Sequence, residues 1–188
     1  MKLVLASKSP RRKEILSMVT SNFSVRVSGA DESVDSVKDL YEIPKILAER
    51  KAEAVSLNDD EIIIGCDTVV IYENELLGKP NDKADAIRML KLLSGTTHYV
   101  VSGLALKSKK KSYSTSVTTA VIMRELTDSE IVSYVEKYCP TDKAGAYGIQ
   151  EMAGSFVEKI DGDFYNVVGL PLCELVLALR HEFGIELN

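Results

Sequence analysis

One carboxylate interrupts the most apolar segment of this 188-residue sequence. Asp67 stands within residues 62–71, a run of β-branched and other apolar residues that is typical of a buried strand. Because burying an unpaired charge is costly, we expect Asp67 to face a cleft, pair with a cation or bind a metal, unless it caps a neighbouring turn. Gly65, two residues earlier, predicts a bulge or the close approach of another backbone segment.

Lys51 is a second charge in an apolar pattern. Residues 44–57 are predicted to form a helix, and Lys51 falls on the same face as Ile43, Leu47 and Ala54. Its ammonium group could pair with a carboxylate, contact a ligand phosphate or extend past its neighbours into solvent.

Hydroxyl and cationic side chains follow the first predicted strand, residues 3–6. Ser9 is a good N-cap and Pro10 suits the first position of a helix. The N-terminus of a helix attracts anions, and Arg11 and Arg12 add forked donors that match phosphate oxygens. The alternative is the solvated face of a surface helix. However, cations are disfavoured in a first turn, so this turn predicts an anion site.

Two loops add candidate ligand contacts. Lys79 precedes Pro80, which favours an extended backbone and holds the lysine on a rigid loop. Residues 142–150 place small residues around Tyr147 and end at Gln150, whose amide can donate to and accept from a nucleobase edge. An ordinary glycine-rich turn is the alternative. With the groups above, a nucleotide polyphosphate and a divalent metal would use every one of these side chains.

The segments that must position these groups alternate between strand and helix early in the chain, with a β-meander in the middle. Helices are predicted after the N-caps Ser9, Asp82 and Thr127, and a last helix is predicted to open at Pro171. The helix at residues 44–57 is described above. Strands are predicted at residues 3–6, 23–27, 62–72, 98–106 and 113–123, and a strand with a turn at 154–163. This order predicts a mixed α/β fold in one domain, residues 1–188, because no linker-like stretch divides the chain.

The composition excludes several classes of protein. Hydrophobic residues make up 45% of the chain and charged residues 27%, as in ordinary soluble domains. A formal charge of −5 argues against a surface that grips nucleic acid or acidic membranes, so partners of those kinds are not expected. No apolar run approaches the ~20 residues of a membrane span, and residues 1–6 are too short for a signal-peptide core, which predicts a cytoplasmic protein.

Six segments, in order across nearly the whole chain, resemble the Maf family: residues 7–12, 65–70, 79–80, 94–98, 142–150 and 166–172. The resemblance implies a cytoplasmic nucleoside triphosphate pyrophosphatase that cuts between the α and β phosphates. It also implies a twisted mixed sheet with flanking helices and a central cleft between two lobes, as in inosine-triphosphate pyrophosphatases, and a homodimer. Thr68 and the ending at Gln150 resemble the branch that acts on dTTP and UTP rather than on 7-methyl-GTP.

The resemblance also assigns roles to individual residues. Asp67 matches the proton acceptor, and we expect it to orient and deprotonate a metal-associated water, although it could instead bind the metal directly. Glu32, which follows a predicted strand end, is added as a ligand with Asp67 for Mg²⁺ or Mn²⁺. Base selectivity is assigned to Arg11, Thr68 and Gln150, and phosphate binding to Ser7, Arg12, Lys51 and Lys79.

Two other functions compete with this interpretation. A haloacid-dehalogenase-like phosphatase also has a nucleophilic Asp after an apolar strand, but it needs a second Asp where this chain has Val69. The other is a regulator of cell division and septum formation that binds nucleotides without turning them over, a role with which the family is also associated.

Overall fold

A mixed sheet of seven strands is the central feature of the computed structural model, which describes residues 1–34 and 37–187. Six strands lie in the order β2-β1-β3-β5-β6-β7, and β4 pairs with β3. Strand β1 is parallel to β2 and β3, whereas β4 is antiparallel to β3 and β7 is antiparallel to β6. The predicted mixed α/β class is therefore confirmed. The strands are β1 (Lys2–Leu5), β2 (Phe23–Val25), β3 (Glu61–Tyr72), β4 (Glu75–Leu77), β5 (Thr97–Lys107), β6 (Ser112–Met123) and β7 (Val157–Asp161).

The chain divides into two compact units. The first contains the described residues of Met1–Thr68, Ser102–Val117 and Tyr165–Asn188, and the second contains Val69–Val101 and Thr118–Phe164. Strands β3, β5 and β6 contribute residues to both. Among the described residues, no helix has the length and apolar character that crossing a membrane requires.

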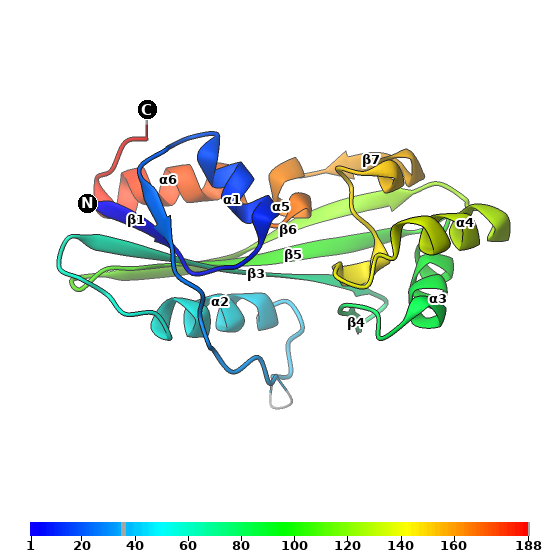
Figure 1. Cartoon of the computed structure of the whole chain (residues 1–188), viewed down its shortest axis with the longest axis horizontal. Helices are drawn as coiled ribbons and strands as arrows, with labels where there is room; N and C mark the ends of the chain where they lie inside the picture. Colours follow the sequence, from blue (N-terminus) through cyan, green and yellow to red (C-terminus); the bar gives the residue numbers. More distant parts are fainter. Residues whose placement is uncertain (35–36, 188) are drawn as a thin grey trace. The chain divides into compact units, whose positions relative to one another are not determined.

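In the first unit, helices lie on both sides of the strands. Helix α2 (Ile43–Glu53) is on one side and α6 (Leu172–Phe183) is on the other (Figure 1). Helix α2 packs on glycines: a Cβ at Gly65 would lie 2.1 Å from the carbonyl oxygen of Ala48, and one at Gly103 would lie 2.0 Å from that of Pro44. The close approach expected at Gly65 is therefore confirmed, and it brings α2 directly against β3. The core between them contains Val4, Ala6, Ala48, Ala52, Val55, Ile63 and Ala105.

Helix α1 (Pro10–Ser17) begins as its sequence predicts. Ser9 has an extended backbone, and its hydroxyl accepts a hydrogen bond from the N–H of Arg12 at 3.4 Å. Pro10 occupies the first helical position, while Ile15 and Leu16 are buried. Because β1 is buried and ends only a few residues earlier, the first turn of α1 is held near the end of that strand.

The second unit contains α3 (Lys83–Leu93) and α4 (Asp128–Tyr138). Asp82 caps α3, and the predicted capping box between Thr127 and Glu130 is present at α4. The strand and turn predicted at residues 154–163 are right in kind, but the strand begins only at Val157, because residues 152–156 form a 3₁₀ helix. The N–H of Gly154 donates to the carbonyl oxygen of Glu151, which closes a turn where a strand would need an extended chain.

Candidate active site

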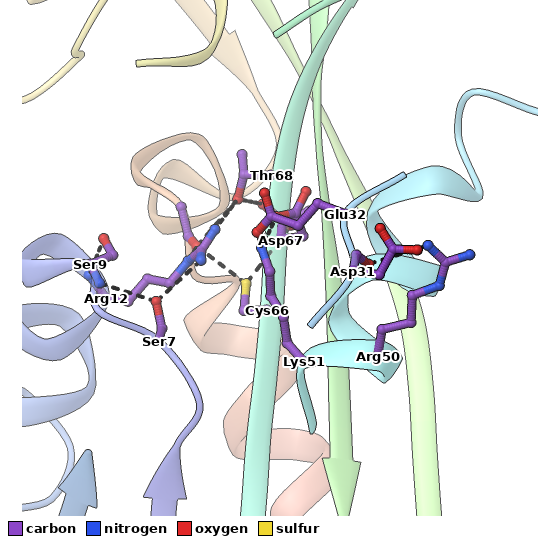
Figure 2. A network of polar contacts seen from close by, with 12 residues as sticks. Ser7, Ser9, Arg12, Asp31, Glu32, Arg50, Lys51, Cys66, Asp67 and Thr68 are labelled. Carbon is purple, nitrogen blue, oxygen red and sulfur yellow. Dashed lines mark hydrogen bonds and ion pairs between the residues drawn. The ribbon is translucent and has the colours of Figure 1, made fainter. Parts of the chain in front are cut away.

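Three charged side chains meet between α2 and β3 in the first unit. The ammonium nitrogen of Lys51 lies 2.5 Å from Oδ1 of Asp67 and 2.9 Å from Oε1 of Glu32 (Figure 2). The side chains of Lys51 and Asp67 are 11% and 14% exposed, whereas that of Glu32 is 65% exposed. Of the alternatives left open by the sequence, Lys51 thus pairs with carboxylates and Asp67 pairs with a cation.

The pKa of Lys51 reflects this pairing. Burial lowers it, but the negative charge of Asp67 and the hydrogen bonds to Asp67 and Glu32 outweigh burial and raise the pKa above its usual value. The ammonium group is therefore charged near neutral pH. The two carboxylates thus share one charged ammonium group.

The loop that carries Glu32 is held by α2. A guanidinium nitrogen of Arg50 donates to the carbonyl oxygens of Ser33 at 2.5 Å and Asp31 at 3.3 Å. The carboxylate of Asp31 accepts from both the N–H and the hydroxyl of Ser33, which lowers the pKa of Asp31. Consecutive residues of one helix, Arg50 and Lys51, thus fix the loop backbone and contact the Glu32 side chain (Figure 2).

Arg12 forms a second group of contacts, centred on the turn after β1. Its Nε donates to the carbonyl oxygen of Gly169 at 2.8 Å, and its two terminal nitrogens donate to the hydroxyls of Ser7 and Thr68 at 3.3 Å each. Ser7 is buried and its hydroxyl also accepts from the N–H of Ser9. Arg11, on the same helical turn, is half-buried. The predicted turn thus contains an arginine whose guanidinium orientation is fixed by the chain itself.

Strand β3 connects the two groups of contacts, because Cys66, Asp67 and Thr68 are consecutive. The hydroxyl of Thr68 lies 2.8 Å from that of Ser102, which donates to the carbonyl oxygen of Asn166. Cys66 is buried, which raises the pKa of its thiol, and its Sγ lies 3.2 Å from the carbonyl oxygen of Gly169. The thiol is therefore protonated and can donate to this carbonyl oxygen.

Four residues that support the site have no role assigned from the sequence: Arg50, Ser102, Asn166 and Gly169, of which the last two lie in the family-like segment 166–172. Ser102 carries the signal that identified Asp67, since it is a polar residue in an apolar strand, and it is fully buried. Arg50 donates to backbone carbonyl oxygens, and Asn166 and Gly169 accept hydrogen bonds through their own carbonyl oxygens. Their sequence pattern gives no indication of such contacts.

Lys79 and Gln150 belong to the second unit, and both are exposed. The loop before Gln150 is anchored by Tyr147, whose hydroxyl lies 2.7 Å from Nε2 of His98. Both side chains are buried, and burial lowers the pKa of His98 to about 4, so its ring is neutral at physiological pH. The predicted glycine-rich loop is therefore an ordered segment that includes a 3₁₀ turn at Ala144–Ala146.

Glu32 and Asp67 are the predicted metal ligands, and the structure brings their carboxylates to one ammonium group. No cluster of three or more His, Cys, Asp or Glu suited to a metal occurs within residues 1–34 and 37–187. Mg²⁺ is commonly held by only one or two carboxylates together with substrate phosphates and water. The two carboxylates therefore fit a hard divalent cation that the substrate helps to bind.

Comparison with known proteins places this chain in a family. A protein named dTTP/UTP pyrophosphatase from Bacillus anthracis is 46% identical over 188 residues, which is all of this chain and 98% of that protein. One of the same name from Bacillus cereus is 45% identical with the same coverage. A dITP/XTP pyrophosphatase structure from Mycobacterium abscessus aligns at a TM-score of 0.44 and 14% identity, over 67% of this chain and 76% of that one. The model of the Maf-like protein family matches residues 2–182, and the chain belongs to that family.

Proposed function

We propose that this protein is a nucleoside triphosphate pyrophosphatase that hydrolyses dTTP and UTP to the monophosphate and diphosphate. The observation that carries the proposal is the Lys51 ammonium group shared by Asp67 and Glu32, together with an arginine, Arg12, whose guanidinium orientation is fixed by the chain. The full-length likeness to proteins of that name supports the choice of substrates.

Asp67 is the group proposed to act on water. Lys51 contacts the carboxylate through Oδ1, so that the second oxygen can accept the proton of a water attacking the α-phosphate. A divalent cation such as Mg²⁺ or Mn²⁺, held by Glu32 and Asp67, would neutralise phosphate charge and lower the pKa of water.

The cationic side chains are proposed to bind the triphosphate. Arg12 and Lys51, with the hydroxyl of Ser7, are expected to stabilise the charge that builds on the phosphoryl oxygens during in-line displacement. Lys79 is proposed as a further phosphate contact. Arg11, Thr68 and Gln150 are proposed to select the base.

Separation of the reaction products tests this function. The protein is incubated with Mg²⁺ or Mn²⁺ and a panel of nucleoside triphosphates, and we expect diphosphate with UMP or dTMP. Inorganic phosphate with a nucleoside diphosphate would contradict the proposal and favour the phosphatase class. Nucleotide binding without turnover would favour the regulator of cell division.

Asp67→Asn tests the proposed base. The substitution keeps the side-chain shape and removes the charge, and we expect turnover to fall by about 100- to 10,000-fold, the usual contribution of a general base. Nucleotide affinity should change much less, and the protein should stay folded, because Lys51 keeps Glu32 as a partner. Wild-type turnover in Asp67→Asn would show that this carboxylate does not perform the chemistry.

The proposal also includes a cytoplasmic homodimer. The family resemblance implies the homodimer, and the cytoplasmic location is expected from the resemblance and from the sequence. Measurement of the molar mass in solution by light scattering, at several protein concentrations, tests the dimer.

A further inference from the structure

The carbonyl oxygen of Gly169 lies within hydrogen-bond distance of three side chains. Arg12 donates through Nε at 2.8 Å, the Cys66 thiol lies at 3.2 Å and the Thr68 hydroxyl at 3.3 Å. Arg12 comes from α1, whereas Cys66 and Thr68 come from β3. One backbone oxygen therefore ties the helix that carries the proposed phosphate-binding arginine to the strand that carries Asp67.

The backbone of Gly169 has a conformation that favours glycine. It follows α5 (Phe164–Val168) with φ +126°, and the N–H groups of Gly169 and Leu170 both donate to the carbonyl oxygen of Tyr165 at 3.0 Å. A Cβ at this position would meet Thr68 Oγ1 at 3.7 Å and Arg12 Nε at 4.0 Å, which are ordinary contacts. A side chain would therefore fit, but the backbone would have to turn, and the carbonyl oxygen would turn with it.

The direction of this carbonyl group matters for Arg12 because the guanidinium is a planar fork with five N–H donors. The contacts with Gly169, Ser7 and Thr68 use one N–H each. Of the five, two therefore remain to donate to an anion. Without the bond at Nε, the long side chain would lose this orientation and would have to recover it, at a cost in entropy, each time a phosphate binds.

We propose that Gly169 is a positioning residue whose carbonyl oxygen holds the Arg12 guanidinium in the orientation that binds the substrate phosphates. This inference rests on the proposed function, since it takes Arg12 as a phosphate contact. Gly169 itself touches neither the substrate nor the reacting atoms. Its effect reaches the phosphates only through Arg12.

A double-mutant cycle on diphosphate binding tests the proposal. The affinity of sodium diphosphate in the presence of Mg²⁺ is measured by calorimetry for the wild type, Gly169→Ala, Arg12→Ala and the double variant. We expect Gly169→Ala to weaken binding by about tenfold, the effect of one lost charge-assisted hydrogen bond. In the Arg12→Ala background the same substitution should have no further effect, because the two residues act as one unit. In steady-state kinetics, kcat/KM should fall by a similar factor, and this loss too should vanish in the Arg12→Ala background.

Gly184→Ala is the matched control. Gly184 also has a positive φ, +66°, at the end of α6 in the same unit, and a Cβ there would meet nothing within 4 Å. Wild-type affinity in this control, beside the loss in Gly169→Ala, would show that the effect is specific to residue 169. An equal loss in both variants would overturn the proposal, because it would reflect general backbone strain.

Arg12→Lys provides a test that does not depend on the folding of Gly169→Ala. Lysine keeps the charge but lacks the planar fork, so we expect it to bind diphosphate little better than Arg12→Ala. Wild-type affinity in Arg12→Lys, or additive losses in the cycle, would overturn the proposal. Unchanged diphosphate affinity in Arg12→Ala would also overturn the assignment of Arg12 to phosphate binding. Weaker affinity in Arg12→Ala together with wild-type affinity in Gly169→Ala would overturn the positioning role alone. The product analysis tests turnover independently of both.

Discussion

Lys51→Met removes the ammonium group that the two site carboxylates share and keeps a side chain of similar length. The substitution affects Asp67 most, because its side chain is 14% exposed and loses a partner at 2.5 Å, whereas Glu32 is 65% exposed and can be solvated. The expected result is a less stable protein whose carboxylates have no cation from the chain at this point.

The size of the effect follows from the burial of Asp67. Breaking a buried ion pair by removing one partner costs roughly 3–5 kcal/mol, and the remaining exposure of Asp67 favours the lower end, about 3 kcal/mol. For a protein of this length each kcal/mol shifts the midpoint of thermal unfolding by roughly 2–4 °C, so a decrease of about 6–12 °C is expected.

Thermal unfolding followed by circular dichroism, with and without MnCl₂, measures both parts of this expectation. A cation present at about 100 times its dissociation constant stabilises the folded state by about 2.7 kcal/mol, which would restore most of the loss. Manganese should therefore stabilise Lys51→Met more than the wild type, in which the ammonium competes for the same oxygens.

Lys83→Met is the matched control. Lys83 pairs with Glu136, and the two side chains are 46% and 58% exposed, so its loss should destabilise the protein much less than the loss of Lys51. The reasoning fails if Lys51→Met unfolds at the temperature of Lys83→Met, or if manganese stabilises Lys51→Met and the wild type equally.

Three further predictions concern other parts of the chain. Gln150→Ala should alter the ratio of kcat/KM values for UTP and CTP by about tenfold, the effect of one hydrogen bond, and an equal loss on every base would exclude a base contact. Burial lowers the pKa of His98 to about 4 in the folded chain, against the usual value of 6.5, so the unfolded chain binds the proton first as the pH falls. Urea titrations should therefore show a loss of about 3 kcal/mol in the free energy of unfolding between pH 6.5 and 4. His98→Gln should remove this pH dependence, and the same dependence in both proteins would contradict the prediction. The hydrogen bond from Arg26, with those from Asn58, lowers the pKa of Glu61 from 4.5 to about 2. The contribution of Glu61 to stability should therefore be present above pH 4.5 and lost as the pH falls toward 2. In the same urea titrations, Glu61→Gln should lose less stability in acid than the wild type.

The sequence predicted those features of the site that depend on neighbouring residues. Ser9 and Pro10 start α1 as expected, because a cap and a fixed φ act within one helical turn. Asp67 and Lys51 were identified because a charge in an apolar pattern needs a partner wherever the segment folds. For the same reason Ser102 could have been found.

Only the tertiary structure decided which partners these residues take. Asp67 meets Lys51 because α2 packs on β3 at Gly65, where no side chain separates the helix backbone from the strand. Arg12 bonds to Gly169, 157 positions along the chain, through a carbonyl group that every residue type possesses. Periodicity and spacing report which face a side chain occupies. The direction of a distant backbone carbonyl depends on how the whole unit packs, so no local pattern could specify it.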